Sequence, residues 1–429
     1  MRYLIKGGRV VDPVSKIDDT SDILIDGNRI AKVAKDLNEK CDTEINAKGK
    51  IVIPGLVDMH SHLREPGRED EETIATGTRA ALRGGFTTIA CMPNTEPPID
   101  SPEMVRKLSG IIKRDAACHV AMVGAITLKR TGRKVAAFSG MKKEGVVAVS
   151  DDGSSVEKAS IMLQALRAAR KSGLLVIDHC EDPKMSAGGV MNKGFISTKM
   201  GLRGIPAEAE STFVKRDIEL AKKARAKIHI AHVSCAKSIE LIRKAKKARL
   251  PVTAETAPHY FSLTEDCCVS YDTNTKMNPP LRTKADVEFI KEALADGTID
   301  VIATDHAPHT DAEKDVEFDF APFGIIGFET ALSLCVMELL DKGVLSWPDL
   351  VMKLSTNPAK ILGCCGGSLK KGSPADITVI DPEKEYVYTK ELVESKSKNS
   401  PFIGWRLKGK AIDVFVGGVL AMKDEEIMV

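Results

Sequence analysis

The sequence predicts an α/β protein, a (β/α)₈ TIM barrel with a small β-sandwich domain formed by both termini. Two observations lead to this prediction. Eight short apolar runs, nearly continuous as in strands buried on both faces, alternate with amphipathic segments of helical period. The two ends of the chain instead carry alternating, turn-rich stretches typical of hairpin strands. Eight strands, each followed by a helix, favour a closed barrel over an open sheet.

The eight predicted barrel strands are residues 51–60, 86–92, 118–126, 145–150, 174–179, 227–233, 251–257 and 299–305. Helical patterns lie between them, for example at 155–173 and at 284–297, where Gly297 is a C-cap signal. Hairpin-like stretches at 3–13, 22–35, 375–387 and 411–423 can pair with one another. We therefore predict a small β domain from residues 1–50 plus 366–429, and a barrel from residues 51–365.

Composition gives no reason to expect a nucleic-acid or membrane partner. The chain has 429 residues and a net charge of +2, and no apolar run approaches a membrane span or a signal peptide. The basic stretch at 222–250 lies on amphipathic helices without interleaved aromatic residues, so we interpret it as a solvated face. Ten scattered cysteines without a CxxC pair indicate reduced, mostly buried thiols, as in a cytoplasmic protein.

Ionisable residues gather where the predicted barrel strands end, which is where the chemistry of such barrels lies. These residues are His60 and His62, Asp151 and Asp152, His179, His232, Asp305 with His306, and His309 just beyond. His60 and His62 are two residues apart on a strand, so both rings can reach one metal ion. Burying this many ionisable groups together without a metal would carry a large desolvation cost. The sequence therefore predicts a metal site.

Imidazoles and carboxylates suit zinc first, with Co²⁺, Mn²⁺ or Ni²⁺ as further candidates. Cys180 and Cys235 are close to ligand histidines in sequence, but Cys180 should point away from His179 and Cys235 enters the following loop. A metal at this rim would lower the pKa of bound water towards ~7, and two metals about 3.5–4 Å apart would need a bridging carboxylate. Asp305 could accept a proton and pass it to a leaving nitrogen. Together these features predict hydrolysis, or its reverse, at an amide-like carbonyl.

With these residues in view, the chain resembles the amidohydrolase superfamily, and within it the dihydroorotases of the bacterial type with a separate β domain. The resemblance covers nearly the whole chain. It rests on the motifs "DMHSHLREPG", "CMPNT", "SDDG", "DHCED", "AHVS", "MNPPLR", "ATDHAPHT" and "APFGIIGFET". It implies zinc-dependent, reversible hydrolysis of L-dihydroorotate to N-carbamoyl-L-aspartate in de novo pyrimidine biosynthesis.

The resemblance also implies the metal ligands, with one or two Zn²⁺ per subunit. It places His60, His62 and Asp305 on the first zinc, and His179 and His232 on the second. Many relatives bridge the two metals with a carbamylated lysine, but "GVVAVSDDG" contains no lysine. An aspartate would take that role here. Asp152 is favoured, and Asp151 remains open.

On the substrate side, Arg64 offers a planar fork suited to the carboxylate that dihydroorotate keeps outside the reacting amide. Alternatively, Arg64 has only a structural role and forms a salt bridge with Glu65 or another nearby acidic residue at the rim of the barrel. The resemblance implies further substrate contacts from Asn94 and His309 to the same carboxylate, and from Asn278, Phe323 and Gly324 to the ring amides.

Several alternatives stay open. A hydantoinase or allantoinase would share the metal rim, although its substrates lack the carboxylate that Arg64 would bind. A catalytically inactive, dihydroorotase-like scaffold would be expected to have lost metal ligands. Residues 309–324 could form a mobile flap or a static rim loop. The resemblance further suggests a homodimer, and docking on aspartate carbamoyltransferase as in some relatives.

Overall fold

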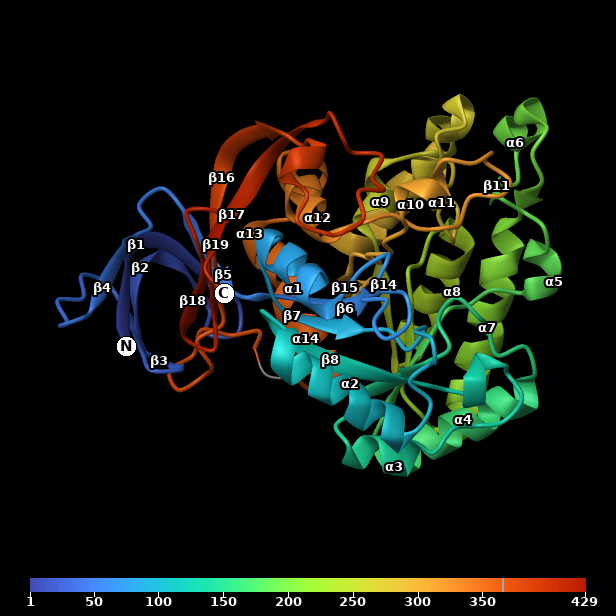
Figure 1. The fold of residues 1–429 in the computed structure, drawn as a ribbon, viewed down its shortest axis with the longest axis horizontal. Helices are drawn as coiled ribbons and strands as arrows, with labels where there is room; N and C mark the ends of the chain where they lie inside the picture. The colour runs from blue at the N-terminus through green and yellow to red at the C-terminus, as the bar shows by residue number, and fades with distance from the viewer. Residues whose placement is uncertain (365) are drawn as a thin grey trace.

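The fold is taken from a computed structural model that describes residues 1–364 and 366–429. Figure 1 shows a barrel with its surrounding helices on one side and a small sheet that contains both termini on the other. The predicted domain boundary at 365/366 falls beside Cys365, which lies outside the described residues. No helix in the described residues is long and apolar enough to cross a membrane.

Eight parallel strands form the barrel sheet in the predicted chain order. They are β6 (Leu56–Ser61), β7 (Phe86–Cys91), β8 (His119–Ala125), β9 (Ala148–Ser150), β10 (Leu175–Asp178), β13 (Ile228–Ile230), β14 (Val252–Thr256) and β15 (Val301–Ile302). A bridge between Ser61 and His306 joins the first strand to the segment after the last. Asp58 of β6 strengthens this junction by accepting the Thr304 N–H at 3.0 Å. The predicted barrel is confirmed, and it is nearly closed.

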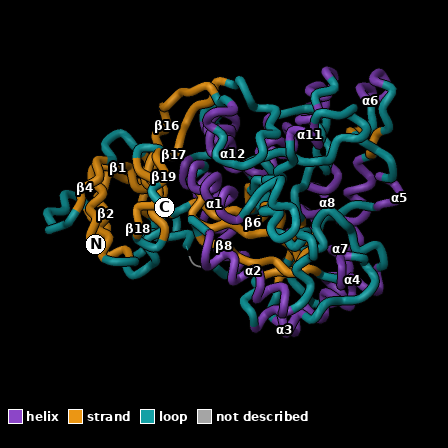
Figure 2. The backbone as a smooth tube through the Cα atoms, in the orientation of Figure 1, coloured by secondary structure: helices purple, strands orange, loops and turns teal. Residues whose placement is uncertain are grey.

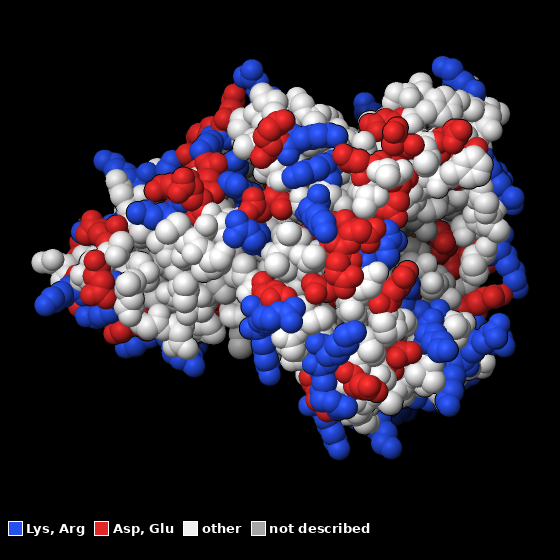
Figure 3. All heavy atoms as spheres, in the orientation of Figure 1, with Lys and Arg blue, Asp and Glu red and all other residues white. Residues whose placement is uncertain are grey.

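Helices cover the outside of the barrel, as the purple segments of Figure 2 show. At least one helix follows each strand, and the longest after each are α1 (Ile74–Arg83), α2 (Pro102–Asp115), α3 (Phe138–Lys143), α4 (Ala159–Ser172), α7 (Ala207–Ala224), α8 (Ala236–Lys247), α10 (Lys284–Ala295) and α12 (Phe328–Cys335). In α8 the buried side chains include Ile239 and Ile242, whereas Lys244 and Lys247 are exposed. The face drawn in Figure 3 carries acidic and basic side chains interspersed.

The small domain is one nine-stranded, mostly antiparallel sheet built from both ends of the chain. Its strands are β1 (Arg2–Asp12), β2 (Ile17–Asp26), β3 (Arg29–Ala34), β4 (Thr43–Asn46), β5 (Ile51–Pro54), β16 (Ile377–Val387), β17 (Arg406–Val416), β18 (Val419–Lys423) and β19 (Glu426–Ile427). Side chains from both halves, such as Ile23 and Phe415, share one buried core. β5 pairs with β16, and this pairing joins the N-terminal strands to the C-terminal ones.

The run 51–60, expected to be one barrel strand, is divided at Gly55. Ile51–Pro54 belong to the small sheet, and Leu56–Ser61 form the first barrel strand. A side chain at Gly55 would collide with Thr87, so glycine lets the chain pass from one sheet to the other. Apolar periodicity cannot reveal this change, because both segments are fully buried.

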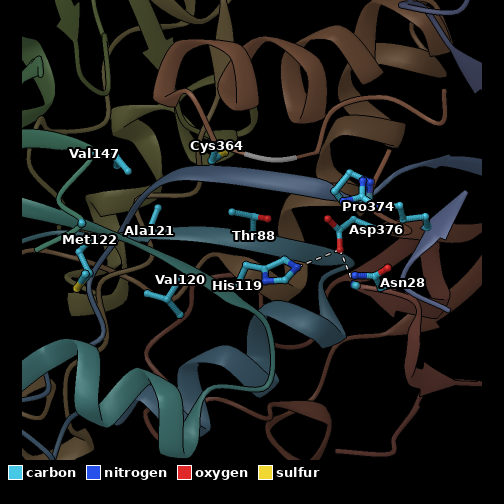
Figure 4. Close-up of a pocket in the computed structure, with 13 residues that line it drawn as sticks. Asn28, Thr88, His119, Val120, Ala121, Met122, Val147, Cys364, Pro374 and Asp376 are labelled. Carbon is cyan, nitrogen blue, oxygen red and sulfur yellow. Dashed lines mark hydrogen bonds and ion pairs between the residues drawn. The ribbon is translucent and has the colours of Figure 1, made fainter. Parts of the chain in front are cut away.

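The two sheets meet at the end of the barrel where the strands begin. His119 Nε2, at the start of β8, lies 3.1 Å from Asp376 Oδ1, and the same oxygen accepts the Gly417 N–H at 2.7 Å. Pairing with Asp376 raises the pKa of His119. A cavity of about 450 Å³, lined in part by Val120 and Met122, lies beside this pair (Figure 4). A polar contact at a mostly apolar junction fixes how the small sheet sits against the barrel.

A C-terminal segment leaves the small sheet and packs on the barrel. Between β16 and β17, Glu394 and Ser395 donate backbone N–H groups to Glu329 of α12, at 2.9 and 3.1 Å. Burial raises the pKa of Glu329 to about 7. We define residues 393–402 as the C-terminal strap, because they cross from the small sheet to the barrel rim. The proposed domain division therefore assigns to the β domain a segment that contacts the barrel.

Glu329→Gln is expected to flatten the pH dependence of stability. A carboxyl pKa raised in the folded state means that ionisation opposes folding, so stability present below pH 4.5 is lost as the pH rises towards about 7. The loss is about 3 kcal/mol for a shift of this size. Thermal unfolding at about pH 5 and pH 8 measures it. An unchanged pH profile in the variant would contradict the assignment, and Glu391→Gln, on the surface, serves as the matched control.

Candidate active site

A pocket of about 190 Å³ opens where the barrel strands end. Most residues predicted for the site line it; the exceptions are His60, which is fully buried, and Asp151 and His306. The lining residues are His62, Arg64, Asn94, Asp152, Gly153, His179, His232, Asn278, Asp305, Ala307, His309, Phe323 and Gly324. The fold thus brings together side chains that are distant in the sequence, because the carboxyl ends of parallel barrel strands share one rim.

His60, His62 and Asp305 form the first group of possible metal ligands, with their ligand atoms within 4.8 Å of one another. His62 Nε2 lies 3.1 Å and His60 Nε2 lies 3.6 Å from Asp305 Oδ1. His60 comes from the end of β6, and Asp305 follows β15. The i, i+2 spacing therefore places both rings on the same side of the strand, as expected.

Asp152 lies between this group and a second one. Its carboxylate oxygens are 3.2 Å from His60 Nε2 and 3.5 Å from His62 Nε2. On the other side, Oδ1 is 3.4 Å from His232 Nε2 and 3.7 Å from His179 Nδ1. These positions suit a carboxylate that bridges two metal ions.

Asp151 points elsewhere. It accepts hydrogen bonds from the backbone N–H of Thr127, at 3.1 Å, and from the Thr127 hydroxyl. Asp151 is absent from the pocket lining, whereas Asp152 is part of it. The geometry therefore favours Asp152 among the two aspartates that the sequence left open.

The donor set fits divalent metal ions. His179 Nδ1 and His232 Nε2 lie 2.8 Å apart, and both face Asp152. His60 Nε2 is buried and forms no hydrogen bond to any described residue. Although burial opposes the charged imidazolium, Asp152 raises the pKa of His60 well above its usual value and that of His179 to about 10. Imidazole nitrogens and carboxylates that together attract a positive charge are the ligands that zinc and similar ions prefer.

The ring nitrogens that face away from the cluster are also held. His60 Nδ1 lies 2.7 Å from Glu255 Oε1, and His62 Nδ1 lies 2.8 Å from Asn94 Oδ1. Each contact fixes the orientation of an imidazole, so that its Nε2 faces the carboxylates. Asn94, predicted as a substrate residue, thus lines the pocket and also orients His62.

Arg64 lines the same pocket as the histidines. Its Nε is 3.0 Å from Glu71 Oε2 and donates to the Pro308 carbonyl at 3.1 Å, while an Nη nitrogen lies 3.3 Å from His309 Nε2. His309 Nδ1 is 2.8 Å from Glu71 Oε1. Arg64 therefore has an acidic partner, as the structural alternative expected, and that partner is Glu71. Glu65 instead accepts the Ile74 N–H.

The backbone near Gly324 is tightly constrained. Gly324 has φ +128, and a side chain there would meet Ala307 at 2.7 Å and His309 Nε2 at 3.3 Å. Its N–H donates to the Lys276 carbonyl at 2.9 Å. His309 Nε2 lies 2.9 Å from the Phe323 carbonyl oxygen, and Asn399 Nδ2 donates to the Gly324 carbonyl at 3.1 Å, so each carbonyl keeps one lone pair for a ligand N–H.

Three predicted site residues have left-handed backbones that the sequence did not indicate. Arg64 has φ 60, His232 has φ 33 and Asp305 has φ 50. Non-glycine residues rarely adopt such angles, although nine others among the described residues do so outside the predicted site, for example Arg225 and Tyr271.

Sequence analysis also missed Glu71, Glu255 and Asn399. Asn399, on the C-terminal strap, accepts the His309 N–H at 3.1 Å and donates to the Ala307 and Gly324 carbonyls, each at 3.1 Å. Glu71 stands in an acidic run that resembles any solvated loop, and nothing in the sequence places Asn399 near the barrel. The strap thus braces the substrate side of the pocket.

The two cysteines considered near the histidines lie outside the pocket lining. Cys180 Sγ donates to Asp178 Oδ2 at 3.0 Å, and Cys235 Sγ lies 3.2 Å from Ser238 Oγ. Burial raises the pKa of the Cys235 thiol to about 12. Both thiols are therefore buried hydrogen-bonding groups.

The loop 309–324 is tied to the barrel rim at several points. Its helix α11 (Asp311–Lys314) carries Glu313, which pairs with Arg68. Lys314 Nζ donates to the Pro322 carbonyl at 2.8 Å, and Lys276 Nζ donates to the Phe318 carbonyl at 2.7 Å. These contacts favour the static rim loop over the flap.

A barrel that carries histidines and aspartates at its strand ends, with a small sheet beside it, has the architecture of the hydantoinase-type amidohydrolases. The solved structure of an L-hydantoinase (dihydropyrimidinase) from Arthrobacter aurescens matches with a TM-score of 0.91 at 24% identity, covering 100% of this chain and 97% of that one. At this identity the likeness concerns the fold.

Sequence comparison is more specific. The family model described as "Dihydro-orotase-like" matches residues 49–238. A dihydroorotase from Elusimicrobium minutum is 52% identical over 100% of this chain and 99% of its own length. One from Pelotomaculum thermopropionicum is 50% identical, with both chains fully covered. The chain belongs to the dihydroorotase family.

Proposed function

We propose that this protein is a dihydroorotase that interconverts L-dihydroorotate plus water with N-carbamoyl-L-aspartate. The observation that carries the proposal is a guanidinium, that of Arg64, in the same small pocket as a cluster of metal-ligating side chains. The cluster supplies what amide hydrolysis needs, and the arginine supplies what a carboxylate-bearing cyclic amide needs. Full-length relatives at about half identity named dihydroorotase support the same substrate.

The cofactor of this site is proposed to be Zn²⁺, one or two ions per subunit. His60, His62 and Asp305 would hold one ion, His179 and His232 the other, and Asp152 would lie between them. Bound there, the metal would supply an activated water and polarise the carbonyl that is attacked. Substrate binding and proton transfer would be carried out by side chains and backbone groups of the protein.

Arg64 would bind the free carboxylate of the substrate, with Asn94 and His309 beside it. Asn278 Oδ1 is buried and has no hydrogen-bond partner among the described residues, so it can accept an N–H of the ring. The carbonyls of Phe323 and Gly324 can accept as well. These contacts hold the ring so that its amide carbonyl faces the cluster.

Asp305 is the proposed acid–base group. In the hydrolytic direction a water oxygen bonds to the ring carbonyl carbon, and Asp305 accepts the proton that the water loses. The ring C–N bond then breaks, and Asp305 returns that proton to the departing nitrogen. Ring closure runs through the same steps in reverse.

Hydantoinases and allantoinases, the alternative cyclic-amide hydrolases, would use the same cluster of metal ligands. Their substrates lack the carboxylate that Arg64 would bind. An assay of the purified protein with dihydroorotate, hydantoin and allantoin, alongside metal analysis, separates them. We expect turnover of dihydroorotate and about one or two zinc ions per chain. Turnover of hydantoin or allantoin alone would overturn the assignment, and no turnover of any substrate by the metal-loaded protein would support a scaffold.

For partners and location, we propose a cytoplasmic homodimer and, as a second partner, aspartate carbamoyltransferase. Light scattering of the purified protein, alone and with the transcarbamoylase, tests both. A monomer that does not associate would refute the proposal.

A further inference from the structure

Glu255 is a buried carboxylate inside the barrel that the proposed reaction does not use. It lies on β14, and its side chain is 1% exposed. Its Oε1 lies 2.7 Å from His60 Nδ1, and its Oε2 lies 3.1 Å from His229 Nε2. Both histidine side chains are fully buried. A carboxylate held this deep is costly unless its partners compensate for lost hydration, so its position calls for a specific role.

The contact with His60 controls which ring nitrogen reaches the candidate metal cluster. With Nδ1 held by Glu255, Nε2 faces Asp152 at 3.2 Å and Asp305 at 3.6 Å. An imidazole without such a partner is free to rotate or to change tautomer. A carboxylate behind a metal-ligating histidine fixes both and makes the ring a better ligand.

Glu255 is also connected to His232, a ligand of the second group, through residues next to it. Its backbone carbonyl accepts the N–H of Val233, the residue directly after His232, at 2.8 Å. His229 is on β13, the strand that leads to His232, and His229 Nδ1 lies 2.8 Å from Thr253 Oγ1 on β14. One residue therefore contacts the ring of a first-group ligand and the backbone turn that carries a second-group ligand.

We propose that Glu255 is a positioning residue for the metal centre, whose side chain holds His60 in the ligating orientation and ties it to the strand that leads to His232. The inference rests on the proposed metal-dependent function. Because the backbone carbonyl survives substitution, a side-chain change isolates the contacts with His60 and His229. The metal position that contains His60 should therefore be affected more than the one that contains His179.

The test is Glu255→Gln, which keeps the shape but removes the charge and one acceptor. Apo protein is titrated with Co²⁺ against a competing chelator, and both affinity and cobalt absorption bands are recorded. We expect Co²⁺ affinity at the His60 position to fall about 10–100-fold, the usual cost of losing such a supporting carboxylate. The absorption bands should change because the ring geometry changes. Glu255→Asp, which keeps the charge on a shorter side chain, is expected to lie between wild type and Glu255→Gln.

Glu329→Gln is the matched control, since it also neutralises a buried glutamate but touches no candidate ligand. It should leave Co²⁺ affinity unchanged. Equal weakening in both variants, or a Glu255→Gln affinity and spectrum matching wild type, would overturn the inference. If Glu255→Gln does not fold, Glu255→Asp decides by the same readouts. Failure of wild type to bind Co²⁺ would instead refute the proposed metal centre, so the two failures are distinguishable.

Discussion

Asp305→Asn is expected to lower kcat for dihydroorotate about 10³-fold. The substitution keeps the shape of the side chain but removes the proposed proton acceptor, and a positioned acid–base group typically contributes about 10²–10⁴-fold. It also weakens a candidate metal ligand, whose oxygen lies 3.1 Å from His62 Nε2. Steady-state kinetics in both directions, with metal content measured on the same sample, separates the two effects.

Asp151→Asn is the matched control for that experiment. Asp151 is buried and directly precedes Asp152 of the cluster, but its carboxylate is bound by Thr127. We expect it to keep most of the activity, whereas Asp152→Asn should lose both metal and turnover. Near-normal kcat for Asp305→Asn, at full metal content, would remove Asp305 from the mechanism.

Arg64→Met is expected to raise KM for dihydroorotate about 100-fold. Removing one partner of a buried, hydrogen-bonded charge pair costs about 2–5 kcal/mol. The effect should depend on the substrate, because dihydrouracil has the same ring without the carboxylate. The ratio of kcat/KM between dihydroorotate and dihydrouracil should therefore fall by a similar factor, which competitive assays with both substrates measure.

Arg68→Met provides the control for charge alone. Arg68 also contacts Glu71, at 3.3 Å, but is absent from the pocket lining. Its loss should leave the substrate ratio unchanged. If Arg64→Met and Arg68→Met shift the ratio equally, the effect of Arg64 is a general one of charge at the rim, and the carboxylate contact is wrong.

The barrel and most of the candidate site could be predicted because both depend on patterns along the chain. Buried strands are recognisable in the sequence as apolar runs. Histidines and aspartates, which can bind metal ions, follow where these runs end. Asp151 and Asp152 show where the pattern stops. β9 ends at Ser150, so both aspartates lie beyond the strand and the alternation of faces no longer applies. Tertiary contacts distinguish them: Asp151 is bound by Thr127, whereas Asp152 faces the histidines.

Other features could not be predicted because they depend on tertiary contacts. The left-handed backbone at Asp305 could not be predicted, because aspartate occurs in turns with either right-handed or left-handed backbone angles. Asn399 lies in a stretch expected to be part of a β domain, and its three side-chain hydrogen bonds are to residues many positions away. In the sequence, Glu255 is recognisable only as one polar residue within a predicted strand. Its partners come from β6 and β13, and strand neighbours in a barrel are not visible in one sequence.

The C-terminal strap has a consequence for how the protein is made. Domains fold during synthesis in order from the N-terminus. In a nascent chain the barrel strands and their histidines emerge first, while β5 still presents an unpaired edge that waits for β16. Residues around Asn399 leave the ribosome only after the whole barrel. The ribosome therefore releases every proposed metal ligand and substrate-binding residue before Asn399, so the hydrogen bonds that brace His309 and Gly324 are the last contacts of the pocket to form.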